Sequence, residues 1–121
     1  MPIAHIAAIN LECSDPDALA AFWAAMLDGE VAIRTPDFCA VKAGPLYLGA
    51  VRVAGYQPPT WPSVERSQQI HLDLAVDGPH DLDEAEAQAI RLGAVKESHQ
   101  STPESWRVLR DPAGHPFCLR R

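Results

Sequence analysis

No stretch of the sequence stays apolar for the roughly 20 residues that a helix needs to cross a bilayer. Residues 1–11 lack the basic start and the long apolar core of a secretory signal. Cysteine is scarce as well, because Cys13, Cys39 and Cys118 are the only three and form no CxxC pair. An odd number of isolated cysteines is typical of reduced thiols. We therefore expect a cytoplasmic protein without disulfides.

The sequence has fewer positively than negatively charged residues. There are 10 lysine and arginine residues against 16 aspartate and glutamate residues, so the formal net charge at pH 7 is -6. Nucleic-acid-binding grooves and surfaces that bind anionic membranes need the opposite balance. Phosphate-binding loops, nucleophile elbows and HExxH motifs are missing too. We expect no nucleic acid and no membrane as partner, and cationic small molecules are the first ligands to test.

The composition is that of an ordinary globular domain. Of the 121 residues, 47% are hydrophobic and 21% are charged, which is close to the average for soluble domains. A chain of this length can bury roughly two thirds of its surface on folding. We therefore expect a folded domain with a core of its own, and neither a disordered nor a fibrous chain.

The first half of the sequence predicts one strand, one helix and three short strands. Residues 3–13 alternate loosely between apolar and polar, as a strand does. Ser14 or Asp15 can cap a helix that starts at Pro16, and the Asp-Gly pair at 28–29 ends it. The apolar residues of this helix recur on one face: Leu19, Phe22, Trp23, Met26 and Leu27. The short strands are expected at residues 30–34, 38–42 and 46–53.

The pattern restarts after residues 54–68, a connector too rich in proline for regular structure. Residues 69–76 alternate strictly, with His71 and Asp73 on one face of the expected strand. A helix is predicted over residues 82–92. The other face of the strand, which we expect to pack under this helix, carries Ile70, Leu72, Leu74 and Val76. Three more strands are expected at residues 95–99, 106–110 and 116–120.

The two halves repeat one pattern at an offset of 64 residues, which separates Ile6 from Ile70 and Gly29 from Gly93. A unit of about 55 residues with one helix cannot cover both faces of its sheet. We therefore predict an α+β fold of two βαβββ modules, whose curved mixed sheets enclose a shared cleft for a small ligand. The modules are expected at residues 1–53 and 69–121, joined by the connector 54–68.

Several motifs, in this order, resemble those of a known superfamily. They are LAAFWAAMLDG (19–29), GYQPPTWP (55–62), HLDLAVD (71–77), LGA (92–94) and WRVLRDPAGHPFCL (106–119). Together they extend over nearly the whole chain, and the DPxGxPFCL pattern is the most specific of them. The sequence resembles the glyoxalase, bleomycin-resistance and extradiol-dioxygenase proteins, also called the vicinal oxygen chelate superfamily. Within it, the chain is similar to a glyoxalase-like subgroup common in actinobacteria.

The resemblance implies a metal site to which the superfamily's enzymes contribute up to four residues, from the first and last strand of each module. In this sequence the four positions fall near Ala8, near Val51, on His71 and on Cys118, where the enzymes carry glutamate. Alanine and valine have no ligating atom, and one histidine with one cysteine is too few for such a site. We therefore expect no metal cofactor, with a divalent metal at a displaced site as the alternative.

The candidate ligand-binding residues are His71, Asp73, Cys118, Trp106, Tyr47, Trp61 and Arg52. His71 can bind a polar group or move a proton near neutral pH, or it can be fixed by Asp73 as a packing residue. Cys118 is either a pocket thiol or a small buried hydrophobe. The aromatic side chains either stack on a flat ligand or belong to the core. Arg52 and the arginines near the C-terminus either pair with a ligand carboxylate or lie on a solvated sheet edge.

Three functions agree with these features. We prefer a bleomycin-resistance-like protein that binds a planar or aromatic molecule in the cleft and does no chemistry. The second is a metal-dependent lyase, isomerase or dioxygenase whose displaced site combines His71 with His5 or Glu12. The third is a metal-free enzyme in which His71 acts as acid or base, which makes His71 the best catalytic candidate. Sheet edges left open by short modules favour a homodimer.

Overall fold

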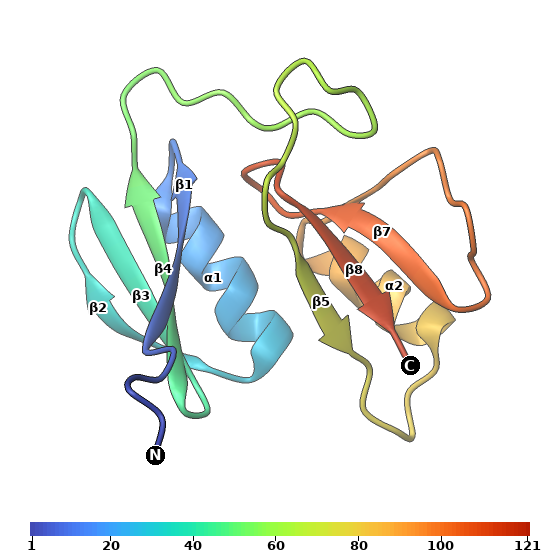
Figure 1. The fold of residues 1–121 in the computed structure, drawn as a ribbon, viewed down its shortest axis with the longest axis horizontal. Coiled ribbons are helices and arrows are strands. Elements are labelled where there is room, and N and C mark those ends of the chain that lie inside the picture. Colours follow the sequence, from blue (N-terminus) through green and yellow to red (C-terminus); the bar gives the residue numbers. More distant parts are fainter. The chain divides into compact units, whose positions relative to one another are not determined.

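One helix and four strands recur in the same order in each half of the chain (Figure 1). The computed structural model describes residues 1–121. It divides into two units, residues 1–57 and residues 58–121. Each unit has the element order βαβββ, so the predicted α+β fold of two repeated modules is confirmed. Neither helix is long and apolar enough to cross a membrane.

The first unit packs its helix on a mixed sheet. Its elements are β1 (Ala8–Cys13), α1 (Pro16–Leu27), β2 (Glu30–Arg34), β3 (Phe38–Ala43) and β4 (Leu46–Arg52). The strand order is β1-β4-β3-β2, with β1 parallel to β4 and the other neighbours antiparallel. Helix α1 packs mainly on β3 and β4.

Helix α1 begins and ends where its capping residues predict. The Asp15 carboxylate accepts a hydrogen bond from the backbone N–H of Ala18 at 3.2 Å, and Pro16 occupies the first turn. At the other end, Asp28 has the left-handed backbone conformation, with φ at 51°. The buried part of the predicted apolar stripe is Leu19, Phe22 and Trp23. Capping and periodicity were therefore enough to place this helix.

The second unit repeats the topology of the first. Its elements are β5 (Leu72–Ala75), α2 (Leu82–Leu92), β6 (Val95–Lys96), β7 (Trp106–Arg110) and β8 (Pro116–Arg120). The strand order is β5-β8-β7-β6, again with one parallel pair, β5 with β8. Asp81 caps α2 by accepting from the N–H of Glu84 at 2.8 Å, as predicted.

The register of the second sheet sorts its side chains onto two faces. Leu74 on β5 pairs with Leu119 on β8, which pairs with Arg107 on β7. Arg107 bonds to α2, so this face is the one that the helix covers. The neighbouring row, Asp73 with Cys118 and Val108, points to the opposite face. Both faces follow from the strict alternation of the sequence.

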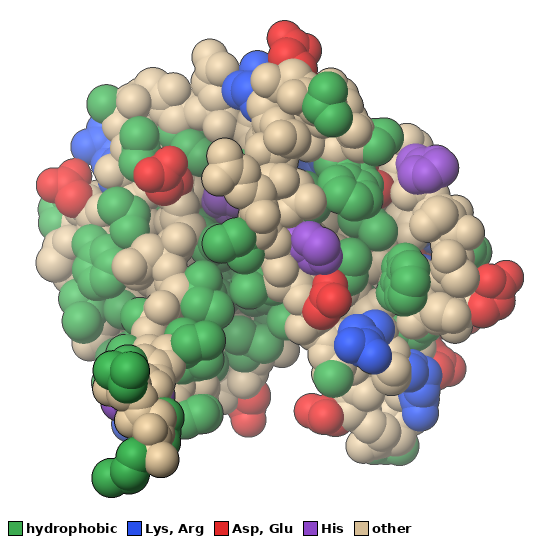
Figure 2. Space-filling view, in the orientation of Figure 1, with side chains coloured by type: hydrophobic (Ala, Val, Ile, Leu, Met, Phe, Trp, Pro, Cys, Tyr) green, Lys and Arg blue, Asp and Glu red, His purple; other side chains and the backbone are tan.

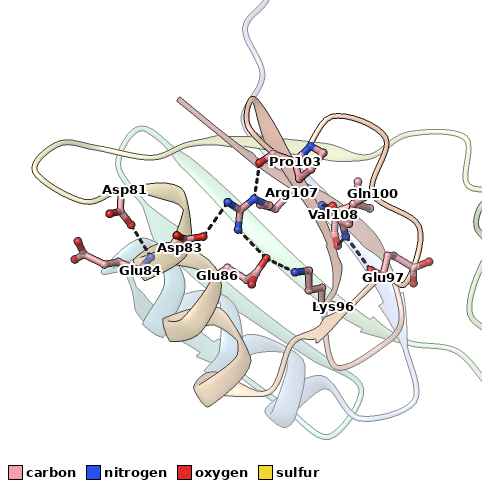
Figure 3. A network of polar contacts seen from close by, with 10 residues as sticks. All are labelled: Asp81, Asp83, Glu84, Glu86, Lys96, Glu97, Gln100, Pro103, Arg107 and Val108. Carbon is pink, nitrogen blue, oxygen red and sulfur yellow. Dashed lines mark hydrogen bonds and ion pairs between the residues drawn. The ribbon is translucent and has the colours of Figure 1, made fainter.

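A network of charged side chains joins α2 to β7 (Figure 3). The Arg107 guanidinium donates to the Pro103 carbonyl at 2.6 Å and to Glu86 at 3.2 Å, and it pairs with Asp83 at 2.9 Å. Glu86 also pairs with Lys96 at 3.3 Å. The Arg107 side chain is only 14% exposed. The interpretation of the C-terminal arginines as a solvated edge is therefore wrong for Arg107.

Four predicted strands are shorter in the structure, and the one expected at 46–53 differs by a single residue, since β4 ends at Arg52. The strand expected at 3–13 starts at Ala8 because its partner β4 starts only at Leu46, after a turn. The strand expected at 69–76 covers Leu72–Ala75, because β8 starts at Pro116, which has no N–H to donate. Ile70 lies outside this strand and is 84% exposed, so it does not pack under α2.

The strand expected at 95–99 shortens to the two residues of β6 for a different reason. The Gln100 side chain takes the place of a further strand beside β7. Its amide nitrogen donates to the Val108 carbonyl at 2.8 Å, and its amide oxygen accepts from the Val108 N–H at 3.0 Å. A side-chain amide can replace a backbone one because it carries the same donor and acceptor. The alternation of apolar residues does not indicate that a side-chain amide replaces the backbone of a neighbouring strand.

Candidate functional site

The second sheet brings His71, Asp73 and Cys118 together on the face turned away from α2. Asp73 on β5 is directly paired with Cys118 on β8. His71 stands two residues before Asp73, and its Nε2 atom lies 3.2 Å from Asp73 Oδ1. The potential ligand atoms of the three side chains all lie within 4.8 Å of one another. Figure 2 shows histidine, acidic and hydrophobic side chains adjoining on the surface of this unit.

The three side chains differ in burial and charge. The His71 side chain is 38% exposed and that of Asp73 is 49% exposed, whereas Cys118 is half-buried. Burial, followed by the negative charge of Asp73 and a hydrogen bond to it, raises the pKa of Cys118 to about 11. Cys118 is therefore a protonated thiol at neutral pH, which disfavours a role as a nucleophile in the protein alone.

Two tryptophans flank this cluster within the second unit. The Trp61 ring lies 6.4 Å from the His71 ring between centroids, tilted by 57°. The indole N–H of Trp61 is buried and has no hydrogen-bond partner, a rare condition for a buried donor. Trp106 opens β7 and is 43% exposed. It is two residues from Val108, so it lies on the same sheet face as Cys118.

Tyr47 and Arg52 belong to the first unit. Both lie on β4, where Tyr47 pairs with Ala8 and donates its backbone N–H to the Ala7 carbonyl. The Arg52 guanidinium forms an ion pair with Asp37 at 3.5 Å. The seven predicted ligand-binding residues thus divide into five in the second unit and two in the first.

The superfamily's four-residue metal site does not fit this chain. The structure places Ala8 at the start of β1 and Val51 near the end of β4, as the resemblance implied, and neither residue carries a ligating atom. The cross-strand partner of Val51 on β1 is Glu12. Both first-unit positions of the shared site are therefore without a donor atom.

Sequence reasoning missed two features of the second unit. One is that Asp73 is the direct neighbour of Cys118, which follows from the parallel register of β5 and β8. The other is that Arg110 pairs with the buried carboxylate of Glu97 and donates to the Trp61 carbonyl at 3.4 Å. Arg110 thus holds the end of the connector against the sheet. No local pattern in the sequence distinguishes it from an exposed arginine.

Two βαβββ modules, with the strand orders β1-β4-β3-β2 and β5-β8-β7-β6, agree with the fold of the glyoxalase, bleomycin-resistance and dioxygenase superfamily. The sequence profile of the glyoxalase-like domain matches residues 8–120. The chain therefore belongs to the glyoxalase-like domain family. Among curated proteins, no significant sequence match was found.

Solved structures agree with this fold at low sequence identity. A glyoxalase/bleomycin resistance protein/dioxygenase family enzyme from Burkholderia phytofirmans is 22% identical, with a TM-score of 0.72 over 96% of this chain and 97% of its own. Lactoylglutathione lyase from Agrobacterium tumefaciens is 20% identical, with a TM-score of 0.66 over 99% and 95%. The fosfomycin resistance protein FosX from Mesorhizobium loti is 12% identical, with a TM-score of 0.71 over 98% and 92%. At these identities the similarity establishes the fold alone.

Proposed function

We propose that this glyoxalase-like domain binds a small planar or aromatic molecule on the open face of its second sheet, without the shared metal site of the superfamily's enzymes. The observation that carries the proposal is the grouping of His71 and Asp73 with Trp61 on that face. Tryptophan offers a flat apolar surface for stacking, and the polar pair fixes the orientation of a ligand. Trp106, exposed on the same face, provides a second aromatic surface.

The charges at the site favour a ligand that carries a positive charge or hydrogen-bond donors. Asp73 is half-exposed, so its carboxylate can accept from a ligand as well as from His71. The net charge of -6 adds a long-range attraction for cations. The buried indole N–H of Trp61 supports a ligand that also offers an acceptor, since an unpaired donor is stabilised once an acceptor reaches it.

Tryptophan fluorescence tests this proposal directly. The purified protein is titrated with matched sets of planar cations, neutral aromatics and planar anions, all in the presence of a chelator. We expect saturable quenching by at least one planar cation, weakened at least tenfold in affinity by Trp106→Ala or His71→Ala. The control is His99→Ala, which removes an exposed histidine elsewhere. Equal affinity in all four proteins, or no quenching by any set, would refute the proposed binding site.

A second candidate is a metal-free acid–base enzyme, favoured by the His71–Asp73 contact. A carboxylate oxygen 3.2 Å from Nε2 orients the imidazole ring. The remaining nitrogen, Nδ1, would then exchange a proton with the ligand. Chemical turnover of the bound molecule, abolished in His71→Gln and slowed in Asp73→Asn, would replace simple binding as the function. Binding with the ligand recovered unchanged would contradict this candidate.

We also propose that the chain forms a homodimer. The first unit exposes large apolar side chains at its N-terminal end, namely Met1, Ile3 and Ile6. Exposed apolar groups in one place are typical of protein interfaces. Light scattering on the purified protein should give twice the chain mass of 13.2 kDa. Changing both Ile3 and Ile6 to serine should shift the mass to that of one chain, and an unchanged dimer mass would rule out this end as the interface.

A further inference from the structure

One cluster on the second sheet combines three kinds of metal ligand within a single module. His71 offers an imidazole nitrogen, Asp73 a carboxylate oxygen and Cys118 a sulfur, and these atoms lie within 4.8 Å of one another. The superfamily's site draws on both modules, whereas this cluster needs only β5, β8 and the residue before β5. Asp73 has no counterpart among the four positions that the resemblance implied.

We propose that His71, Asp73 and Cys118 form a binding site for one Zn²⁺ ion, with a fourth position open for a ligand oxygen or nitrogen. This inference deepens the proposed function, because the metal would sit where the planar molecule is expected to bind. It does not depend on the organic ligand, since metal binding can be measured without it.

The distances suit a small tetrahedral ion. Zinc bonds of about 2.0–2.3 Å place neighbouring ligand atoms about 3.3–3.6 Å apart in a tetrahedron. His71 Nε2 and Asp73 Oδ1 are already 3.2 Å apart. The other separations reach at most 4.8 Å, so the sulfur needs to approach by about 1 Å, which a side-chain rotation can supply. The backbone register of β5 and β8 needs no change.

The ligand chemistry selects zinc over magnesium or calcium. A thiolate and an imidazole are soft to intermediate ligands, which zinc accepts and hard cations avoid. Binding converts the Cys118 thiol to a thiolate and releases one proton to the solvent. Asp73 contacts His71 and accepts a hydrogen bond from the Cys118 thiol. When zinc binds, the Asp73 carboxylate would bond to the ion instead of accepting that hydrogen bond.

The exposure of the cluster leaves room for a fourth ligand. The side chains of His71 and Asp73 are 38% and 49% exposed, so one side of the ion would face solvent. Three protein ligands with one open position are typical of zinc sites that bind a water or a substrate, whereas structural sites are closed by four. A bound molecule with an oxygen or nitrogen donor beside its ring would therefore complete the site.

Cobalt provides a spectroscopic test, because Co²⁺ occupies zinc sites and absorbs strongly in the near ultraviolet when a thiolate is a ligand. Tag-free, chelator-treated protein is titrated with CoCl₂ and then with ZnCl₂ as competitor. We expect saturation at one ion per chain, a thiolate-to-cobalt band, and loss of the band on adding zinc. Native mass spectrometry should show one zinc per chain.

Matched variants assign the ligands. Cys118→Ala should abolish the band, and His71→Ala or Asp73→Asn should weaken zinc binding by about 100-fold or more, beyond the loss typical of supporting residues. His99→Ala and Asp77→Asn, both at exposed positions, should bind as the unchanged protein does. Circular dichroism checks that each variant is folded. If Cys118→Ala does not fold, Cys118→Ser replaces it as the variant without the thiolate.

Two results would overturn the zinc site: no saturable binding by the unchanged protein, or a band that persists in Cys118→Ala and Cys118→Ser. Failure of the proposed function looks different, since it is the absence of tryptophan quenching by planar molecules. The two experiments therefore fail independently, because one uses metal without an organic ligand and the other uses organic ligands with a chelator.

Discussion

Arg107 links β7 to α2 through its ion pairs with Asp83 and Glu86. We expect Arg107→Met to lower the free energy of unfolding by about 3 kcal/mol. Methionine keeps most of the aliphatic stem that packs between strand and helix. What it removes is the guanidinium group and its bonds to Pro103, Asp83 and Glu86. These hydrogen bonds raise the pKa of Arg107, chiefly the one to Asp83, so the charge is present at every pH of interest.

The expected size follows from how exposed each partner is. Asp83 is 83% exposed, and ion pairs with such groups contribute about 0–1 kcal/mol. Glu86 is only 16% exposed, and hydrogen bonds to buried charged groups contribute about 1.5–3 kcal/mol. Lys96 pairs with Glu86 at 3.3 Å in the unchanged protein, and we expect this ion pair to persist in the variant. The loss should therefore stay at the lower end of the range of about 3–5 kcal/mol for a broken buried pair.

Urea unfolding followed by circular dichroism measures the loss. Asp83→Asn is the matched control and should cost less than about 1 kcal/mol, with the difference shrinking in high salt. Glu86→Gln should fall between the two, at about 1–2 kcal/mol. The reasoning is refuted if Asp83→Asn costs as much as Arg107→Met, or if Arg107→Met unfolds within about 0.5 kcal/mol of the unchanged protein.

Three further predictions concern other parts of the chain. Cys118, with a pKa of about 11, should react slowly with iodoacetamide at neutral pH and faster as pH rises; a rate that levels off below about pH 9 would contradict this. Gln100→Ala removes both bonds to Val108 and should lower the free energy of unfolding by about 2 kcal/mol in urea; a neutral effect would mean that water replaces the amide. Gly49→Ala places a Cβ atom against Asn10 Oδ1, closer than van der Waals contact allows, and should lower the melting temperature. An unchanged melting temperature would contradict this prediction.

Local chemistry determined most of the fold from the sequence alone. The ends of both helices were predictable, because a helix end must satisfy its unpaired backbone groups locally. The N-caps are Asp15 and Asp81, and the C-caps are Asp28 and Gly93. The lengths of the strands were less predictable, because a strand ends where its partner ends. In the first unit, the start of β1 at Ala8 is evident only from its pairing with β4.

The site was predictable only in part for the same reason. His71 and Asp73 share a strand face by simple alternation, so their meeting could be anticipated. The contact of Asp73 with Cys118 depends on the register of two parallel strands that lie far apart in the sequence. The partners of Arg107 and Arg110 depend in turn on where α2 and the connector pack.

The Gln100 amide also has a consequence for how copies of this chain can associate. The Gln100 amide accepts from the Val108 N–H and shares the Val108 carbonyl with the backbone N–H of Glu97, so this position of β7 is closed to a strand from another molecule. An unpaired strand edge invites uncontrolled addition of further strands, and a side chain cannot propagate a ladder as a backbone does. Association of the second unit by strand addition at this point is thereby blocked. The homodimer proposed above would therefore use a surface other than this position of β7.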